Sequence, residues 1–511
     1  MIGRRTPTFP VLLAAALLLA PVAEATSHVF SKRFGSTAEQ VITSVAVDGG
    51  GNVIVTGSFA GTIDFGGGTL TSAGGTDIFL AKLDVDGRHV WSGRSGAGQP
   101  QAGNGVAGDG AGGGYLTGIF AGTVDFGGGA LASAGSRDVF VARFDAAGNH
   151  VWSERFGDAG TQNGTGLAVD GSGSVVVVGF FVGSIDFGGG TLTSAGLEDA
   201  YLAKLGANGN HIWSKSFGDS DVQVVAGVAV DGSGNVIATG SFKGTVSFGG
   251  GALTSAGSRD VFLARFDSAG NHSWSKRFGD SSNQHGTAVA VDASGNPVIT
   301  GSFEGSADFG GGALTSFGLS DIYLAKLDVN GNHVWSKAFG GPVGDEGLGL
   351  AVDGSRDVVL TGAFQESVNF GGGVLACGGP IDFFVARFGP SGVHVSSACA
   401  GDELPQQGLT AAFDAAGNVL VAGRFQGTLD LGGGVLTSAG EWDAFLAKLG
   451  RGAILHPVTP CRVVDTRNAV GPRGGPALEP APSNRVFAVA GVCGIPATAK
   501  AIAGNITVTQ T

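Results

Sequence analysis

The motif Phe65-Gly66-Gly67-Gly68 decides the fold, because it returns at a constant spacing along most of the chain. Each copy begins 61 residues after the previous one, without an insertion or a deletion. The later copies begin at Phe126, Phe187, Phe248, Phe309, Phe370 and, with leucine in place of phenylalanine, Leu431. A fixed period of this kind is the signature of a repeat architecture, so the chain contains seven copies of one unit.

Each repeat carries four strand signals. In the first repeat they are residues 44–48, 52–59, 77–83 and 89–92, which are rich in β-branched and aromatic residues and are bounded by glycine-containing turns. A glycine-rich connection, residues 60–76, separates the second strand from the third. Four-stranded units repeated radially are typical of a β-propeller. We therefore predict an all-β, seven-bladed β-propeller, with a stacked solenoid as the competing interpretation.

The two ends of the repeat region distinguish these interpretations. Residues 28–35 match the fourth strand of a repeat, yet no first strand precedes them. The last repeat ends its third strand at Leu449 and has no fourth strand after it. A closed ring would use the N-terminal strand to complete the last blade, which removes an exposed sheet edge. We expect residues 28–34 to pair with residues 443–449.

The composition narrows the class of protein. Glycine accounts for 96 of 511 residues, hydrophobic residues for 43% and charged residues for 14%. This balance excludes a long coiled coil and a disordered chain, and favours a turn-rich, packed β fold. The net charge of −13 argues against nucleic acid as the main partner, because phosphate backbones are bound by clustered Lys and Arg.

The N-terminus has the features of a secretory signal peptide. Arg4 and Arg5 precede an apolar run at residues 11–20, and Ala23-Glu24-Ala25 fits a cleavage site. The run is too short to span a bilayer, and no later stretch is long and apolar enough to do so. We expect a signal peptide at residues 1–25, cleaved after Ala25, a propeller at residues 26–450, and a final location outside the cell or on its surface.

Two stretches resemble known groups of proteins. Residues 230–240 and 321–327 carry motifs similar to the seven-bladed propeller repeats of secreted bacterial proteins, and this resemblance covers residues 28–449. It implies the fold and says little about activity, because propellers host many functions. Residues 459–467 and 493–496 look like a β-rich C-terminal module of secreted bacterial proteins. We expect such a module at residues 451–511, incomplete at its end, with Cys461 paired to Cys493.

The other two cysteines lie in the sixth repeat. Cys377 occupies the position of Ser72, just before the third strand, and Cys399 occupies the position of Arg94, at the end of the fourth strand. Both positions lie at the same end of a blade, and the other repeats carry no cysteine at either one. We predict a Cys377–Cys399 disulfide; two buried thiols are the alternative.

Several motifs with possible chemistry have a structural explanation. Residues 103–108 match a dinucleotide-binding pattern, but no helical pattern follows them. Segments such as residues 231–235 resemble calcium loops, although Asp, Gly and Asn are also the expected hairpin formers. The repeated His and Trp of the fourth strand are interpreted as packing residues, and the Asp that opens each third strand as a turn acceptor. No cofactor is predicted.

One end of the propeller carries the variable connections. The loops from the fourth strand of one blade to the first strand of the next contain acids and no Lys or Arg. The acids are Glu39, Asp158, Asp219, Asp221, Asp280, Asp345, Glu346, Asp402 and Glu403. This pattern favours weak binding of divalent cations or of basic partners at that end. The alternative is that these are solvated loop residues.

The sequence thus favours a secreted, non-enzymatic scaffold that binds a ligand or partner on an acidic loop face. The partner is unidentified; a cationic ligand, a protein or a glycan would fit, and we expect a monomer. The second interpretation is an extracellular glycan-degrading hydrolase or lyase, which would need paired carboxylates converging on the central channel. A third is a structural protein of the cell surface or matrix.

Overall fold

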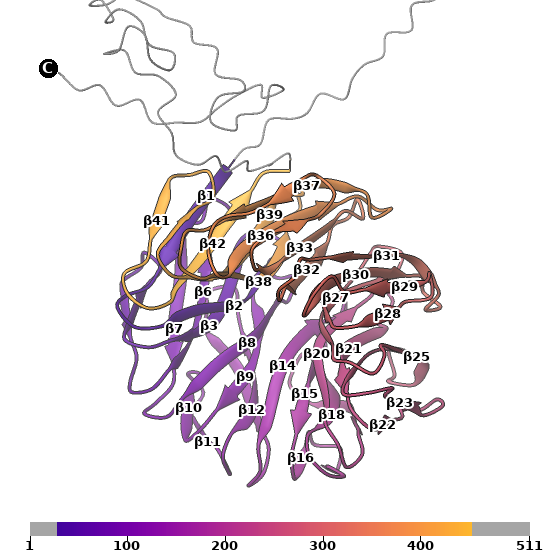
Figure 1. The fold of residues 1–511 in the computed structure, drawn as a ribbon. Helices are drawn as coiled ribbons and strands as arrows, with labels where there is room; N and C mark the ends of the chain where they lie inside the picture. Colours follow the sequence, from indigo (N-terminus) through magenta and orange to yellow (C-terminus); the bar gives the residue numbers. More distant parts are fainter. Residues whose placement is uncertain (1–27, 452–511) are drawn as a thin grey trace, which may run out of the picture.

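The computed structural model describes residues 28–451, and within that range the chain forms 42 strands (Figure 1). They make seven four-stranded antiparallel sheets and seven two-stranded hairpins, which confirms the predicted all-β, seven-bladed propeller. A search of the same residues for a helix able to cross a membrane finds none. The expected signal peptide and C-terminal module, including Cys461 and Cys493, lie outside the described residues.

The four strands of each blade are named a to d from the centre outward. The a strands are β2 (Gln40–Val47), β8 (Gln101–Gly108), β14 (Gln162–Val169), β20 (Gln223–Val230), β26 (Gln284–Val291), β32 (Glu346–Val352) and β38 (Gln406–Phe413). The b strands are β3 (Val53–Phe59), β9 (Gly114–Phe120), β15 (Val175–Phe181), β21 (Val236–Phe242), β27 (Pro297–Phe303), β33 (Val358–Phe364) and β39 (Val419–Phe425).

The outer strands follow the same order. The c strands are β6 (Asp77–Leu83), β12 (Asp138–Phe144), β18 (Asp199–Leu205), β24 (Asp260–Phe266), β30 (Asp321–Leu327), β36 (Asp382–Phe388) and β42 (Asp443–Leu449). The d strands of blades 1 to 6 are β7 (His89–Ser95), β13 (His150–Phe156), β19 (His211–Phe217), β25 (His272–Phe278), β31 (His333–Phe339) and β37 (His394–Ala400).

A short hairpin lies between strands b and c of every blade, in the segment that the sequence showed only as a glycine-rich connection. The hairpins are β4 (Thr62–Asp64) with β5 (Thr69–Thr71), β10 (Thr123–Asp125) with β11 (Ala130–Ala132), β16 (Ser184–Asp186) with β17 (Thr191–Thr193), β22 (Thr245–Val246) with β23 (Leu253–Thr254), β28 (Ser306–Asp308) with β29 (Ala313–Thr315), β34 (Val368–Asn369) with β35 (Val374–Leu375), and β40 (Thr428–Asp430) with β41 (Val435–Thr437).

The tip of each hairpin explains the Phe-Gly-Gly-Gly motif. A Cβ on Gly67 would lie 2.0 Å from Cε1 of His89, so the ring of the histidine that opens β7 needs a glycine beneath it. Gly66 and Gly68 have φ of 102° and 116°, which L side chains rarely adopt. Phe65 is 4.7 Å from the ring of Phe34 and 5.1 Å from that of Phe79, and so seals the junction between two blades. The packing interpretation of the repeated histidines is confirmed.

The ring closes as predicted. The N-terminal strand β1 (His28–Phe34) pairs antiparallel with β42 and completes blade 7, whose strand order is β38, β39, β42, β1. Figure 1 shows the indigo β1 beside the last strands of the chain. Arg33 of β1 donates to Asp443 of β42 at 2.7 Å, and Phe30 is buried at the position that Trp holds in other blades. The solenoid interpretation is therefore wrong.

The a strands surround the central axis, and each contains a β-bulge. At four bulges the extra residue donates to a backbone carbonyl of the next blade, as Thr43 Oγ1 does to Gly103 at 2.6 Å. The a strand of blade 1 begins at Gln40, four residues before the predicted start at residue 44. The bulge between Ile42 and Ser44 interrupts the alternation of inward and outward side chains by which a strand is recognised in a sequence.

Candidate functional site

The two ends of the propeller differ in how far they follow the repeat. We call the end that carries the a–b and c–d turns the turn face, and the end that carries the d–a loops and the b–c connections the loop face. On the turn face, Asp48 accepts hydrogen bonds from the backbone of Gly50 and Asn52, which confirms that the Asp-x-x-Gly-Asn segments are turn formers. Trp91 Nε1 donates to the carbonyl of Ala146 in the next blade, and four further Trp do the same.

The base in each c strand is paired on the turn face. Lys82 lies 2.7 Å from Asp48, and both side chains are buried. In blade 5 burial acts to raise the pKa of Asp292, but hydrogen bonds from Lys326 and Asn296 outweigh it and lower the pKa to about 2. Equivalent pairs join Arg143 to Asp109, Lys204 to Asp170, Arg265 to Asp231, Arg387 to Asp353 and Asp357, and Lys448 to Asp414.

Four of the predicted loop-face acids hold the loop face together. Asp158 accepts hydrogen bonds from the backbone of Gly160, the amide of Gln162, and both the backbone and the hydroxyl of Ser184. Burial acts to raise the pKa of Asp158, and these hydrogen bonds outweigh it and lower the pKa. Asp219, Asp280 and Asp402 make the same kind of contacts across a d–a loop and a b–c connection.

Two further predicted acids have basic partners. Glu39 lies 3.0 Å from Arg424, whose guanidinium stacks 4.3 Å from the ring centre of Trp442, and Asp221 lies 3.0 Å from Lys243. Arg424 comes from a b strand and Lys243 from a b–c connection. The d–a loops contain no Lys or Arg, as the sequence indicates, and these two bases reach the acids from other segments of the loop face.

Asp345 is buried, although the sequence suggested an exposed loop acid. It occupies the position of Gln40 in the repeat, and its oxygens accept from the backbone of Gly341 and Gln365. A Cβ on Gly340 would lie 2.1 Å from an oxygen of Asp321 and 2.7 Å from an oxygen of Asp345. The two carboxyl groups therefore lie next to the same glycine. Burial raises the pKa of each to about 6.

The Asp that opens each c strand is a turn acceptor, as predicted. Asp77 accepts from the backbone of Ala73 at 2.8 Å and from Arg94 at 2.6 Å. Three blades have lost this arginine: Ser216, Ala338 and Cys399 stand in its place. Burial raises the pKa of their aspartates, to about 6 at Asp321 and Asp382 and in the same direction at Asp199.

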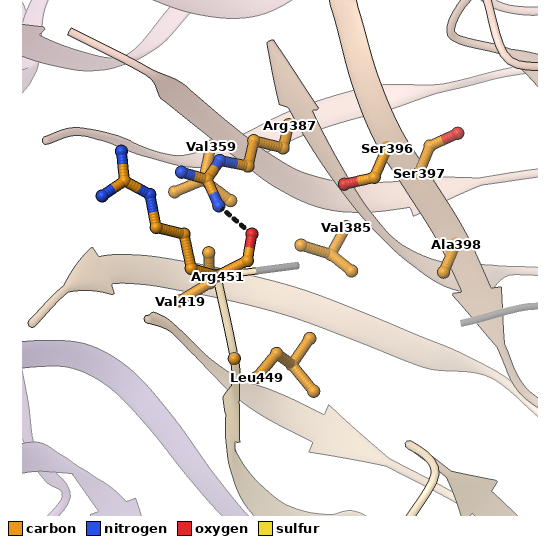
Figure 2. Close-up of a pocket in the computed structure, with 10 residues that line it drawn as sticks. Val359, Val385, Arg387, Ser396, Ser397, Ala398, Val419, Leu449 and Arg451 are labelled. Atoms are coloured by element: carbon orange, nitrogen blue, oxygen red, sulfur yellow. Dashed lines mark hydrogen bonds between the residues drawn. The ribbon is translucent and has the colours of Figure 1, made fainter. Parts of the chain in front are cut away.

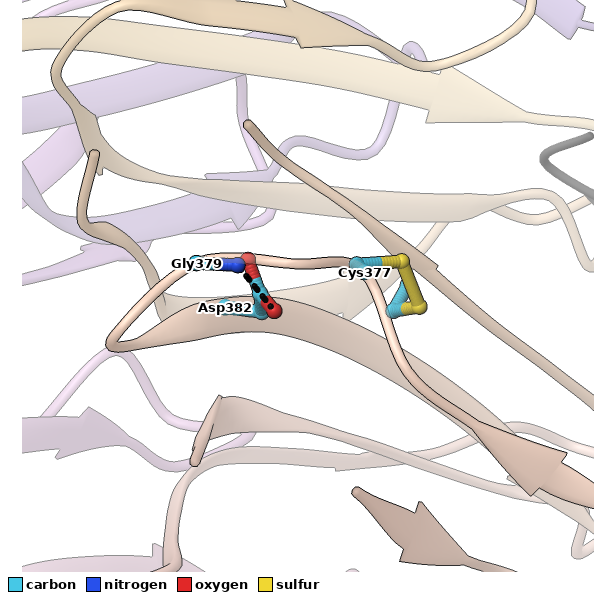
Figure 3. Close-up of a disulfide and its surroundings, with 4 residues drawn as sticks. Cys377, Gly379 and Asp382 are labelled. Carbon is cyan, nitrogen blue, oxygen red and sulfur yellow. Dashed lines mark hydrogen bonds between the residues drawn. A yellow bond between two sulfur atoms is a disulfide. The ribbon is translucent and has the colours of Figure 1, made fainter. Parts of the chain in front are cut away.

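The predicted Cys377–Cys399 disulfide is confirmed (Figure 3). It joins the b–c connection of blade 6 to the end of β37, and Gly379 next to it donates to Asp382. The bond therefore stands where four other blades place an arginine. It fixes a loop-face segment to the outer strand of its own blade.

Glu346 and Glu403 remain as exposed acids, with Glu346 now the first residue of β32. Two more exposed glutamates, Glu366 and Glu441, lie on b–c connections of blades 6 and 7. None of these four takes part in an ion pair within residues 28–451. We call them the glutamate set. Sequence reasoning missed Glu366 and Glu441 because it weighed only the d–a loops.

The same part of the loop face carries exposed apolar residues, which sequence reasoning also missed. Phe317 and Leu319 are each 66% exposed at positions that other repeats fill mostly with Ala, Gly or Ser. A Cβ on Gly318 between them would lie 2.3 Å from the carbonyl carbon of Pro342, so the two loops touch. We call the exposed residues of this junction and the next the apolar arc: Phe317, Leu319, Pro342, Pro380 and Leu404.

The junction between blades 6 and 7 holds a small cavity of about 20 Å³, lined in part by Val385, Ser396 and Leu449 (Figure 2). Ser396 replaces the Trp of the repeat. Figure 2 shows Arg387 donating to the carbonyl of Arg451 across this space. The cavity has room for about one water molecule, so it offers no ligand site. Within residues 28–451, no three His, Cys, Asp or Glu side chains are placed to share a metal ion.

Comparison with known proteins gives only distant likenesses. No family model matches the chain. An uncharacterized WD repeat-containing protein of Acanthamoeba polyphaga mimivirus is 22% identical over 376 residues, which cover 58% of this chain and 27% of that protein. The regulatory protein FlaEY of Caulobacter vibrioides is 24% identical over 280 residues, covering 50% of this chain and 29% of that protein. The chain thus spans less than a third of the length of these two relatives.

A similar likeness holds for solved structures. A chain in the crystal structure of the mitotic checkpoint complex matches 88% of this chain over 99% of its own length, with 11% identity and a TM-score of 0.44. The Neurospora crassa Pan2 WD40 domain matches 80% of this chain over 88% of its own length, with 10% identity and a TM-score of 0.37. The fold assignment therefore stands on the strand order of the chain itself, which is that of a seven-bladed β-propeller.

Proposed function

We propose that this propeller is a non-enzymatic scaffold that binds a protein partner on the loop face of blades 5 to 7. The observation that carries the proposal is that the apolar arc and the glutamate set lie on this one sector. Exposed apolar side chains rimmed by polar residues mark interaction sites. Their positions in the repeat are occupied mainly by small or polar residues elsewhere, so the blade fold itself does not require them.

The partner segment should combine apolar and basic side chains. Phe317 and Leu319 offer an aromatic and an aliphatic anchor, and buried anchors of this kind supply most of the energy of an interface. The four glutamates would attract Lys or Arg around that centre and speed association. This refines the prediction of a cationic partner: most of the acids singled out in the sequence hold loops together or have bases, whereas the glutamate set is free to face a partner.

The loop face is held in shape before a partner arrives. The Cys377–Cys399 bond, the Asp402 hydrogen bonds and the Arg424–Glu39 pair fix the segments that flank the apolar arc. Binding to such a face costs little ordering of loops. The disulfide also supports a location in an oxidising compartment, in keeping with the expected signal peptide. Secretion or display at the cell surface is part of the proposal.

A display selection with random linear peptides tests this function. Peptides enriched on the immobilised parent protein should carry Lys or Arg next to aromatic or aliphatic residues, and should bind more weakly as salt rises. Hydrogen exchange with such a peptide bound should slow at residues 317–320, 342–346 and 402–405. Enrichment of acidic peptides, or protection confined to the turn face, would contradict the proposal.

A further inference from the structure

The d strand of blade 1 lacks two large side chains on the face that it turns toward blade 2. Trp91, Gly93 and Ser95 alternate along β7 and therefore share one face. In blades 4 and 5 the same three positions hold Trp, Lys and Phe. The lysine stem lies against the turn of the next blade: Cε of Lys276 is 2.7 Å from the position of a Cβ on Gly331. Gly93 has no side chain to take the place of the lysine, and Ser95 is too small to fill the place of the phenylalanine.

The phenylalanine of the repeat covers the next blade. The ring of Phe217 in blade 3 lies 5.0 Å from that of Phe248 and 5.6 Å from that of Phe266. Ser95 cannot make these contacts, and the residues it should cover are less buried. Phe144 is 8% exposed, whereas its equivalent Phe266 is 0% exposed. Leu80 of blade 1 is 6% exposed, whereas the equivalent leucines of blades 3 to 5 are 0% exposed.

A cavity of about 180 Å³ results between blades 1 and 2. Its inner wall is formed by Ile78, Leu80, Leu116 and Phe144, which are buried. Trp91 borders it, and the exposed Gly93 and Ala147 lie at its mouth. An apolar cavity of roughly 150 Å³ in another protein binds benzene, so this one has the capacity for a single aromatic ring.

Blade 6 shows that truncation alone does not create such a space. Ser396, Ala398 and Ala400 replace Trp, Lys and Phe on β37, yet the cavity there is about 20 Å³. Phe383, which is directly opposite Ala400 in the sheet, supplies the missing bulk and is fully buried. The residue opposite Ser95 is Ile78, which is larger than the Val or Ala of four other blades but lacks the ring that Phe383 brings to blade 6. The loss in blade 1 is not compensated.

We propose that the cavity between blades 1 and 2 binds one small, single-ring aromatic molecule of the phenol type. The ring would occupy the place that Phe217 fills in blade 3, in contact with Phe144. The hydroxyl would lie beside that of Ser95, which is also part of the cavity wall. This site is on the outer side of the ring, between blades 1 and 2, and is independent of the loop face of blades 5 to 7.

Phenol, with toluene as its apolar counterpart, is the probe. Ligand-observed NMR and thermal unfolding of the full chain should show saturable binding and a rise in the unfolding temperature with phenol concentration. Ser95→Phe should raise the unfolding temperature without ligand and reduce phenol affinity at least tenfold. Val90→Thr, on the opposite face of the same strand, should bind phenol as the parent does.

Gly93→Lys provides a second test. It introduces at the mouth of the cavity the lysine that blades 4 and 5 have at this position, and it leaves the inner part of the cavity unfilled. It should also weaken phenol binding, and it keeps the proposal testable if Ser95→Phe does not fold. Tighter binding of phenol than of toluene supports the hydroxyl contact. Absence of saturable binding to the parent, or equal binding by the parent and both variants, would overturn the proposal.

Discussion

Asp345 lies beside Asp321 at the junction of blades 5 and 6, where the other six junctions place a glutamine next to the aspartate that opens the c strand. Blade 5 has also lost the arginine that pairs with this aspartate in four other blades, because Ala338 stands in its place. Two buried carboxyls therefore meet without a base. Glu366, in the next connection, adds to the upward shift of the pKa of Asp345.

The contribution of this pair to the free energy of unfolding should be more favourable at about pH 5 than at pH 7, whereas His28, His272, His285 and His394, whose pKa values burial lowers, act in the opposite direction. Folding raises the pKa of both carboxyls from 3.8 to about 6, so the folded chain holds protons that the unfolded chain releases. Their ionisation opposes folding above pH 6, and that opposition fades as the pH falls from 6 toward 4. Chemical unfolding at a series of pH values measures the effect.

Asp345→Gln introduces the glutamine found at this position in the other six repeats, and it should remove the part of this pH dependence that Asp345 contributes, while the raised pKa values of Asp321 and Asp382 persist. It should also raise stability at pH 7. Glu346→Gln, which removes the same charge from the exposed neighbour, is the matched control and should change little. A stability difference between the parent and Asp345→Gln that stays the same from pH 7 to pH 5 would contradict the assignment. Below pH 4 stability should fall in any case, because aspartates such as Asp292 have lowered pKa values.

The arginine that pairs with the c-strand aspartate gives a second prediction. Arg155→Ala leaves Asp138 buried without its partner and should lower the free energy of unfolding by about 3 kcal/mol. Ser216→Arg offers Asp199 the missing partner and should raise it by about 1 kcal/mol at neutral pH. Denaturant titration of both variants checks the pair. Stabilisation by Arg155→Ala would show that the contact is not favourable.

The disulfide of blade 6 should stabilise the protein by about 2–4 kcal/mol. The double variant Cys377→Ser/Cys399→Ser removes it and leaves Asp382 without an arginine. Cys377→Ser/Cys399→Arg removes it too, but introduces the residues of the first repeat, Ser72 and Arg94. The arginine variant should therefore be the more stable of the two. Equal stability of these variants would mean that Asp382 gains nothing from an arginine at that position.

Ring closure by β1 predicts that deleting residues 28–34 lowers the unfolding temperature and promotes association. The deletion leaves β42 with an unpaired edge, which can pair with another chain. Light scattering and thermal unfolding report both effects. Deleting seven residues within 468–485, a Pro- and Gly-rich stretch outside the described residues that the sequence predicts to be a loop, is the control in the same chain. A truncated protein that melts like the parent and stays monomeric would be incompatible with closure in solution.

The sequence predicted the blades because their strands alternate in the expected way and recur at one spacing. The sequence also predicted the disulfide, because Cys377 and Cys399 both occur in the sixth repeat, at positions where no other repeat has a cysteine. The burial of Asp345 and the exposure of Phe317 were missed, although both stand out when the repeats are aligned position by position. The cavity beside Ser95 could not be predicted from the repeat alignment alone. It depends on which residue lies opposite the small one in the sheet: Ile78 lies opposite Ser95 in blade 1, whereas Phe383 lies opposite Ala400 in blade 6 and fills the space there.

The affinity of the loop face for a selected basic, apolar peptide tests the central claim most directly. Titration calorimetry should compare the parent with Phe317→Ser/Leu319→Ser and with Leu197→Ser, which removes the exposed leucine at the equivalent position of blade 3. We predict that the double variant loses at least tenfold in affinity, about 1.4 kcal/mol, while Leu197→Ser stays within twofold of the parent. Unchanged affinity in the double variant would contradict a binding site on blades 5 to 7.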